Sequence, residues 1–365
     1  MGLTFIKGTN IDFVGQRYKA YALSSFLLVG ALFAMLFTGG PRLGIDFSGG
    51  IIVQVQFQQP VDDEALKNNL DVEHLPNLST QRFGEGGRDY LLRFSTTDIP
   101  VQELRDGVLG VLQTAFSGNA AEIARLEMVG PKVGAELTRK AMEALYYAVL
   151  LIAVYISGRF EQRWVAAAAM AGALWGGVYV ASLFGVGTGG LVLVALGITV
   201  AVSWRLKLNF ALGAVVGVLH DVFITLGILT MLGKEINLNV VAALLTLAGW
   251  SLNDTIIIYD RIRENLRRAP TDELSVIINQ SVNQTLSRTV ITSGTTFMAV
   301  LALYLLGGGV INDFALTMLL GVVIGTLSSI YVSSPLLLAL GTTEQYVQTH
   351  QKQQNYEKPG EHGVV

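Results

Sequence analysis

Long apolar runs fill the second half of the chain, and one more lies near its start. About 20 consecutive apolar residues are enough for a helix to cross a bilayer. We therefore predict eight membrane-spanning helices, the first at residues 19–38 and the others within a bundle at residues 139–340. The runs in this bundle are residues 140–157, 164–186, 189–204, 210–232, 238–259, 288–307 and 311–337.

In residues 42–136 the hydrophobic residues recur with a shorter period than in the apolar runs. In I51IVQVQF57 the apolar side chains alternate, as in a strand with one buried face. A helix start with acidic residues follows at V61DDEALKNNL70. Two strand-like runs, 78–83 and 90–95, are separated by the turn signal E85GGRD89. A helix at 101–116 and a strand at 121–129 complete the order βαββαβ, which predicts one small α+β domain of the ferredoxin-like type.

Composition agrees with a polytopic α-helical membrane protein. Only 15% of the 365 residues are charged and 51% are hydrophobic, whereas a soluble protein carries about 25% charged residues. There is no cysteine, which excludes disulfides and thiolate metal sites. The four histidines (His74, His220, His350 and His362) are too scattered to indicate a metal site.

Charge is segregated along the chain. Residues 42–136 hold eight basic and fourteen acidic residues, whereas short loops after later apolar runs are rich in Arg and Lys. Because such loops face the cytoplasm, we expect residues 42–136 to be extracytoplasmic. The cytoplasmic parts would be the N-terminus 1–18, the segment 260–287 and a polar, disordered tail at 341–365.

Several apolar runs contain ionisable side chains. A charge at mid-bilayer costs about 2.5–3.5 kcal/mol on insertion scales. Asp254 lies about one and a half turns inside the inner end of its predicted span, and His220 and Asp221 lie near the middle of theirs. Arg288 begins the span 288–307. A carboxylate at this depth needs a cation or a proton, so loss of water and a nearby guanidinium would act on Asp254 in opposite directions.

Helical spacing gathers these groups onto small or polar faces. We expect the faces to meet one another, because small residues let helices approach and hydroxyls bond across the contact. Such faces can also serve packing alone, and Arg288 could extend to the headgroups. The faces are Gly213, Gly217, Asp221 and Thr225; Arg288, Thr292, Thr295, Thr296 and Ala299; Asp313, Thr317, Gly321, Gly325 and Ser329; and Thr246, Gly249, Asn253 and Asp254.

No enzyme motif accompanies these residues. The stretch G227ILTMLGKE235 has the wrong spacing for a phosphate loop and lacks its Ser or Thr. Energy would therefore come from an ion gradient or a partner, and one proton driven by 100 mV releases about 2.3 kcal/mol. The expected ion-coupling residues are Asp254, Arg288, Asp221, Asn253 and His220, with Thr292, Thr295 and Thr296 as a supporting polar face.

Six motifs in order carry a family resemblance across nearly the whole chain. They are G44IDFSGG50, V129GPKVGAEL137, L219HDVFITLG227, S251LNDTIIIYDRIRENLRR268, N283QTLSRTVITSGTT296 and G321VVIGTLSSIYVSSPLLL338. Together they resemble the SecF family of protein-export membrane subunits, in the resistance-nodulation-division superfamily.

The resemblance implies a multi-pass subunit of the bacterial plasma membrane that pairs with SecD. The pair would use the proton gradient, without a bound cofactor, to draw secreted polypeptides outward through the SecYEG translocon. YajC is a further implied partner; membrane lipid surrounds the protein, and no nucleic acid is involved. The family's membrane Asp falls on Asp254 and its membrane Arg on Arg288, while the main proton carboxylate of the pair is thought to belong to SecD.

One feature departs from the family, which usually has six spans. Here R159FEQRW164 is followed by about 40 extra apolar residues, which we interpret as a two-helix insertion turning at G185VGTGG190. The motif G44IDFSGG50 is expected to be structural. Its residues Gly44, Asp46, Gly49 and Gly50 would form a tight turn, with Asp46 accepting glycine N–H bonds.

Two other functions remain open at this point. A stand-alone transporter of drugs or lipids from the same superfamily would usually have two halves in one chain, whereas this chain has one and no internal repeat. A passive scaffold for the translocon would need no buried charge and would leave Asp254 unexplained.

Overall fold

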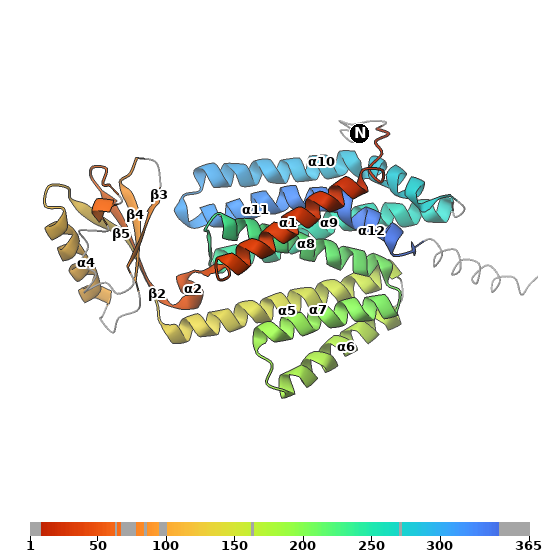
Figure 1. Ribbon diagram of the computed structural model, residues 1–365, viewed down its shortest axis with the longest axis horizontal. Coiled ribbons are helices and arrows are strands. Elements are labelled where there is room, and N and C mark those ends of the chain that lie inside the picture. The colour runs from red at the N-terminus through yellow and green to blue at the C-terminus, as the bar shows by residue number, and fades with distance from the viewer. Residues whose placement is uncertain are drawn as a thin grey trace, which may run out of the picture.

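A small β-sheet lies at one end of a helical bundle in this computed structural model (Figure 1). The structure describes residues 9–62, 64–66, 78–83, 86–94, 101–161, 164–269 and 272–342. The predicted helix at 61–70 lies mostly outside these ranges, although Glu64, Ala65 and Leu66 are helical. Nearly all of the expected tail also lies outside them.

Seven helices of the described chain are long and apolar enough to cross a membrane. The eighth predicted span is shorter, with an apolar part at Gly189–Arg205, because glycines at its start and Trp204–Arg205 at its end limit the apolar run. The helices are α1 (Arg17–Phe37), α5 (Pro131–Glu161), α6 (Trp164–Leu183), α7 (Thr188–Arg205), α8 (Asn209–Met231), α9 (Leu238–Arg268), α10 (Leu274–Leu306), α11 (Gly309–Ser328) and α12 (Ser334–Ala339).

Helices α9 and α10 extend beyond their predicted spans. Most of the segment 260–287 is therefore helical, with a break between Arg268 and Leu274. The polar extension of α9 is helical because charged side chains pair along its surface: Glu264 binds both Arg261 and Arg268, one turn away on either side.

The sheet follows the strand order expected of a split βαβ arrangement. Its strands are β2 (Gly50–Phe57), β3 (Ser79–Phe83), β4 (Asp89–Phe94) and β5 (Ala121–Val129), in the order β3-β4-β2-β5 with antiparallel neighbours. Alternating residues of β2 and β4 are buried in one core with Leu104, Val108 and Leu112 of α4 (Val101–Ala115).

The G44IDFSGG50 motif joins the sheet to the bundle. Strand β1 (Arg42–Leu43) pairs in parallel with β6 (Glu235–Ile236), and α2 (Ile45–Ser48) follows. Gly49 and Gly50 have φ of 70° and 135°, which favours glycine. The expected role of Asp46 was wrong: its carboxylate accepts the Leu238 N–H, at 2.9 Å, because the motif lies against the start of α9.

The last helix of the bundle is interrupted. Between α11 and α12 the chain forms a π-helix, η1 (Ser329–Ser333). Pro335 has no N–H to donate to the carbonyl four residues earlier, and its ring crowds that carbonyl. The Ser334 hydroxyl instead donates to the Ser329 carbonyl at 2.6 Å, so the helix widens at this point.

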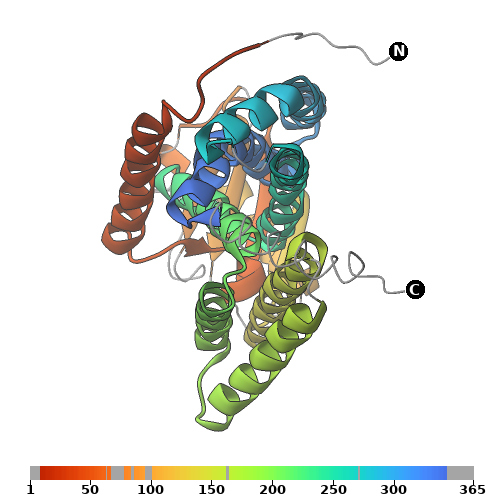
Figure 2. The ribbon, with the colours of Figure 1, turned by 90° about the vertical axis from the view of Figure 1, so that its right-hand side faces the viewer.

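Helices α6 and α7 form a hairpin at the edge of the bundle (Figures 1 and 2). This hairpin is the predicted insertion, and its turn points toward the end that carries the sheet (Figure 1). The start of α1, the α9–α10 turn and α12 lie at the opposite end (Figure 1).

Candidate functional site

The small-residue face of α8 packs tightly in the centre of the bundle. A Cβ at Gly213 would meet the Tyr259 hydroxyl at 2.5 Å, and one at Gly217 would collide with the Ser333 hydroxyl. A Cβ at Gly325 of α11 would lie 3.4 Å from Asp221 Oδ2. The glycines therefore allow α8, α9 and α11 to approach closely around Asp221, as the spacing predicted.

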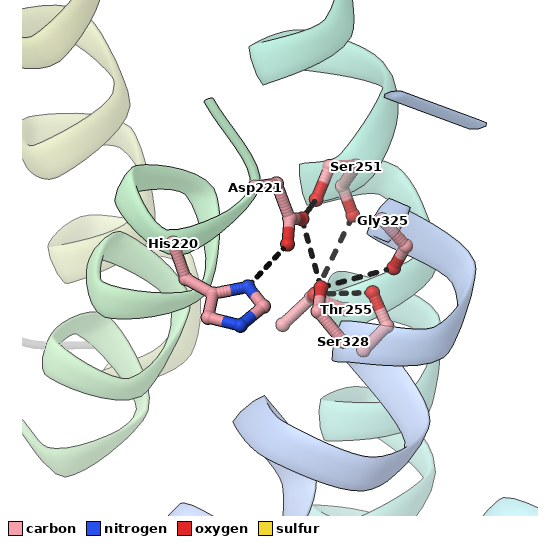
Figure 3. A network of polar contacts seen from close by, with 7 residues as sticks. His220, Asp221, Ser251, Thr255, Gly325 and Ser328 are labelled. Carbon is pink, nitrogen blue, oxygen red and sulfur yellow. Dashed lines mark hydrogen bonds and ion pairs between the residues drawn. The ribbon is translucent and has the colours of Figure 1, made fainter. Parts of the chain in front are cut away.

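Asp221 is fully buried and has three side-chain partners (Figure 3). Its Oδ2 accepts hydrogen bonds from Ser251 Oγ of α9 at 2.5 Å and from Ser328 Oγ of α11 at 2.8 Å. Its Oδ1 lies 2.8 Å from His220 Nδ1. The sequence predicted His220 and Asp221 as a pair, but it did not indicate the two serines that complete the site.

A second set of hydroxyls continues from this site along α9 and η1. Thr255 Oγ1 lies 2.9 Å from Ser329 Oγ, and the Tyr259 hydroxyl donates to the Ser333 carbonyl at 2.8 Å. These residues are all buried. They follow one another toward the end of the bundle that is opposite the sheet.

Asp254 lies in a separate polar cluster between α9, α10 and α11. Its side chain is 1% exposed, and Ser293 Oγ of α10 donates to its Oδ2 at 3.2 Å. Thr326 Oγ1 of α11 in turn donates to Ser293 at 2.9 Å. Ser293 is the one hydrogen-bond donor to Asp254 among the described residues, so this carboxylate is far less enclosed by polar groups than Asp221.

Arg288 and the threonine stripe of α10 do not face the other helices as expected. Arg288 is exposed and is close enough to act electrostatically on Asp254, but no ion pair joins the two within the described chain. The Thr292 and Thr295 hydroxyls donate to carbonyls of α10 itself. The helix is rotated so that Thr289 and Ser293 face inward, and the predicted stripe lies largely at the surface.

The face of α9 beside Asp254 is also exposed. Asn253, predicted as an ion-coupling residue, points away from the bundle core together with Ala242, Thr246 and Gly249. These four positions recur with helical spacing, and three of them are small or hydroxyl-bearing. A Cβ at Gly249 or at Gly294 of α10 would meet nothing within 4 Å. Together the exposed positions of α9 and α10 form one surface, which we call the open face: Ala242, Thr246, Gly249, Asn253, Arg288, Gly294 and Thr295.

Family comparisons agree with the sequence motifs. The pattern of the family described as "Protein export membrane protein SecD/SecF, C-terminal" matches residues 111–188 and 174–343. The pattern of the "SecD/SecF GG Motif" matches residues 34–61, which include G44IDFSGG50. The stretches 111–188 and 174–343 overlap inside the α6–α7 hairpin, where the chain departs from the usual spacing of the family.

Full-length relatives carry one common name. Proteins named "Protein translocase subunit SecF" are 38% identical in Calditerrivibrio nitroreducens (90% of this chain and 93% of that one) and 41% identical in Magnetococcus marinus (92% and 94%). The relative in Escherichia coli O157:H7 is 37% identical over 96% of this chain and 92% of its own.

A solved structure shares the fold. The crystal structure of SecDF, described as a translocon-associated membrane protein from Thermus, aligns with a TM-score of 0.68 and 31% identity. The match covers 94% of this chain but 40% of the SecDF chain. These matches favour a translocase subunit over a stand-alone transporter. The chain belongs to the SecD/SecF family of protein-export membrane proteins, as a non-enzymatic translocase subunit of the SecF type.

Proposed function

We propose that this subunit acts with SecD to use the proton gradient for moving secreted proteins through SecYEG, across the bacterial plasma membrane. The observation that carries the proposal is Asp254: a buried carboxylate in a membrane-spanning helix, with one serine donor in the described chain, next to Arg288 and the open face. Burying a carboxylate without a fixed cation is costly, so its position favours a charge that changes during a cycle.

Asp254, Arg288 and Asn253 would form the part of the relay that SecD completes. In the described chain alone, Arg288 and Asn253 are exposed, although both lie in helices that cross the membrane. A guanidinium cannot release its charge, so Arg288 would bind a carboxylate of SecD or Asp254 in different steps. A helix shift that changes the distance between Arg288 and Asp254 would change the proton affinity of Asp254.

The position of SecD follows from the open face. The matched stretch is 40% of the SecDF chain, and we propose that a SecD subunit supplies here what the rest of that chain supplies there. The small residues Ala242, Gly249 and Gly294 would allow its helices to approach closely. SecYEG, YajC and the unfolded secretory polypeptide are further partners in this proposal.

The proposed orientation places the ferredoxin-like domain (42–136) outside the cell. The chain would then enter from a cytoplasmic N-terminus (1–18), cross first at 19–38, and return through the bundle 139–340 to a cytoplasmic tail (341–365). An outer domain after the first span and two inner termini require an even number of spans. We therefore count α7 as the eighth; its 18 residues reach about 27 Å, close to the thickness of the hydrocarbon core.

The orientation can be tested with single cysteines, because the chain has none. An impermeant thiol reagent added outside should label Gly187→Cys in the α6–α7 turn, and should label Arg268→Cys only after the cells are opened. Labelling of Gly187→Cys from the cytoplasmic side alone would contradict an α7 that spans the membrane.

Function is tested in proteoliposomes that hold SecYEG, SecD and this subunit, with SecA and ATP added. Asp254→Asn keeps the shape of the side chain but fixes it in a neutral form, so stimulation by a proton gradient should be lost. Asp254→Glu is the matched variant and should keep part of it. Arg288→Lys keeps a charge without the planar fork and should be partly active.

The same vesicles separate the possible ions. A proton gradient without sodium, and a sodium gradient at equal pH on both sides, are applied in turn. Full stimulation of Asp254→Asn by the proton gradient would refute the proposal, and stimulation of the wild type by sodium alone would replace the proton in it.

A further inference from the structure

The buried polar groups of α8 continue past Asp221 in both directions along one face. Thr225 lies one turn toward the sheet end, and Gly217 and Gly213 lie one and two turns toward the other end. The Ser333 and Tyr259 hydroxyls fill the space over these two glycines. We call Thr225, Asp221, His220, Ser333 and Tyr259 the polar column. It is separate from the Asp254 cluster, which has its own hydrogen bonds to α10 and α11.

Several atoms of the polar column are buried without a hydrogen-bond partner. They are His220 Nε2, Ser333 Oγ and Thr225 Oγ1. His220 is 9% exposed, and Thr225 and Ser333 are fully buried. In Figure 3 the His220 ring presents Nδ1 to Asp221 and turns Nε2 toward the Ser328 end of the site, away from Ser251. Buried polar atoms without partners are rare in folded proteins and ask for an explanation.

The charge of the His220–Asp221 pair can explain why Nε2 is buried without a partner. Asp221 Oδ2 accepts from two serines, and with Asp221 ionised His220 Nδ1 donates to Oδ1. With His220 neutral the pair carries one negative charge at mid-membrane, and with Nε2 protonated the pair is neutral.

No fixed cation nearby can take this role. The one buried Arg or Lys in the described chain is Arg263, which lies twelve residues, or about 18 Å, along α9 from Ser251. The ionisable groups toward the middle of the helices packed against α8 are Tyr21 of α1, Lys140, Glu143, Tyr147 and Tyr155 of α5, Asp254 and Tyr259 of α9, and Tyr331 of η1. Lys140 is the one lysine or arginine in this set, and it is exposed and lies 4.0 Å from Glu136.

We propose that His220 and Asp221 form a second proton-binding site, which exchanges protons with the cytoplasmic end of the bundle along the Ser333 and Tyr259 hydroxyls. The proposal rests on the proposed gradient-driven function and adds a site to it. The proton binds to the lone pair of Nε2 and gives an imidazolium, while Nδ1–H stays bonded to the Asp221 carboxylate. On release the same proton leaves from Nε2, and the Asp221 bonds are unchanged.

The π-helix η1 places Ser333 in this path. A regular α-helix would rotate Ser333 by a large part of a turn relative to Ser328, whereas the wider π-turn keeps both serines on the side of α8. π-turns inside α-helices often occur at functional sites. The Tyr259 hydroxyl donates to the Ser333 carbonyl, which holds the two residues of the proposed path side by side.

Two variants and one matched control test the path in the SecD-containing proteoliposomes. His220→Asn keeps a donor to Asp221 but has no basic nitrogen that could bind a proton in place of Nε2, so gradient stimulation should be lost. Ser333→Ala removes a hydroxyl that has no partner, so it should not destabilise the fold, yet it should lose most of the stimulation. Ser203→Ala is the control, since Ser203 is equally buried in α7 and its hydroxyl also lacks a partner; it should behave as wild type.

The protonation of His220 can also be followed by spectroscopy, without a transport assay. A chain with His74, His350 and His362 changed to Gln has one histidine, whose ¹⁵N signals report the state of Nε2 in nanodiscs with SecD. We expect the ¹⁵N signal of Nε2 to change as the pH is varied, and proton exchange with solvent to slow in Ser333→Ala but not in Ser203→Ala.

The outcomes separate this site from the main proposal. If Asp254→Asn loses stimulation while His220→Asn and Ser333→Ala keep it, the second site is refuted and the proposed function stands. If Asp254→Asn keeps stimulation, the proposed function fails, and the ¹⁵N signals still decide whether His220 binds a proton. A His220 signal that does not change with pH refutes the second site.

Discussion

Asp221 and Asp254 are both buried carboxylates in neighbouring helices, but their surroundings differ. Asp221 has two serine donors and a histidine, all from helices of this chain. Asp254 has one serine donor in the described chain and lies beside the open face. Helix α8, which holds Asp221, is 67% buried over its most apolar window, whereas α10, which carries Arg288, is 11% buried.

The difference indicates which parts of the machine are complete in this subunit. A carboxylate with its hydrogen bonds made inside the chain can bind and release a proton wherever SecD is. A carboxylate at an open face acquires its final electrostatic surroundings only when a partner covers it. The first site would therefore be a property of the subunit, and the second a property of the complex.

Removing the two carboxylates should have unequal effects on the isolated chain. Asp221→Ala leaves Ser251, Ser328 and His220 Nδ1 without their shared partner, and should lower stability by about 3 kcal/mol, as expected when buried polar groups lose their hydrogen bonds. Asp254→Ala leaves Ser293 still bonded to Thr326 and should cost less than about 1 kcal/mol. Reversible unfolding in mixed micelles measures both, and equal losses would contradict the contrast.

SecD should protect the open face and not the rest of the bundle. The thiol of Asn253→Cys should react readily with a small membrane-permeant maleimide in the isolated chain and several-fold more slowly in the complex. Leu193→Cys on α7, where Leu193 is 70% exposed, should react equally in both samples. Unchanged reactivity of Asn253→Cys would move the SecD contact to another face.

Glycines on the two sides give a smaller test. A Cβ at Gly325 would lie 3.1 Å from Ser251 Cβ and 3.4 Å from Asp221 Oδ2, so Gly325→Ala should push these groups apart and cost about 1–2 kcal/mol. Gly249→Ala meets nothing in this chain and should stabilise the isolated helix by up to about 1 kcal/mol. It should nevertheless weaken binding of SecD, measured by co-purification at graded detergent concentration.

The sequence predicted the elements well because their patterns are local. Seven spans, the described strands and the insertion hairpin follow from hydrophobic period, glycine clusters and charged ends. The extensions of α9 and α10 were missed because a polar helix outside the membrane carries no hydropathy signal. The π-helix η1 depends on a single proline, Pro335, among residues that read as a plain apolar span.

The site was predicted less completely, because rotation of a helix about its axis is a tertiary property. The small-residue faces of α8 and α11 were correct, since close glycine contacts fix their orientation. On α10 the threonines of the predicted stripe lie one to three positions from the inward-facing Ser293, and the spacing alone did not separate them. Ser251 and Ser328 were missed because serine is common in apolar runs. Each nevertheless follows a glycine of a predicted face, Gly249 or Gly325, by less than one helical turn.

The smallest expected effect concerns a third carboxylate, Asp12, which is exposed and outside the spans. Its Oδ1 accepts hydrogen bonds at 2.7 Å from Asn279 Nδ2 of α10 and from the Gly15 N–H. These bonds, and more weakly the charge of Arg17, lower the pKa of Asp12 below its ordinary value of 3.8. They hold a segment in which Phe13 and Val14 are buried, with Phe13 packed edge-on against Tyr331 of η1.

Because the folded pKa is the lower one, the stabilisation by Asp12 is complete above about pH 4 and is lost as the pH falls through the folded value. Hydrogen exchange of the Gly15 amide, corrected for its intrinsic pH dependence, should be constant from neutral pH to about pH 4 and then rise. In Asp12→Asn this acid-induced rise should be absent. A loosening of the Asp12 segment that begins between about pH 5 and pH 8 would contradict this assignment.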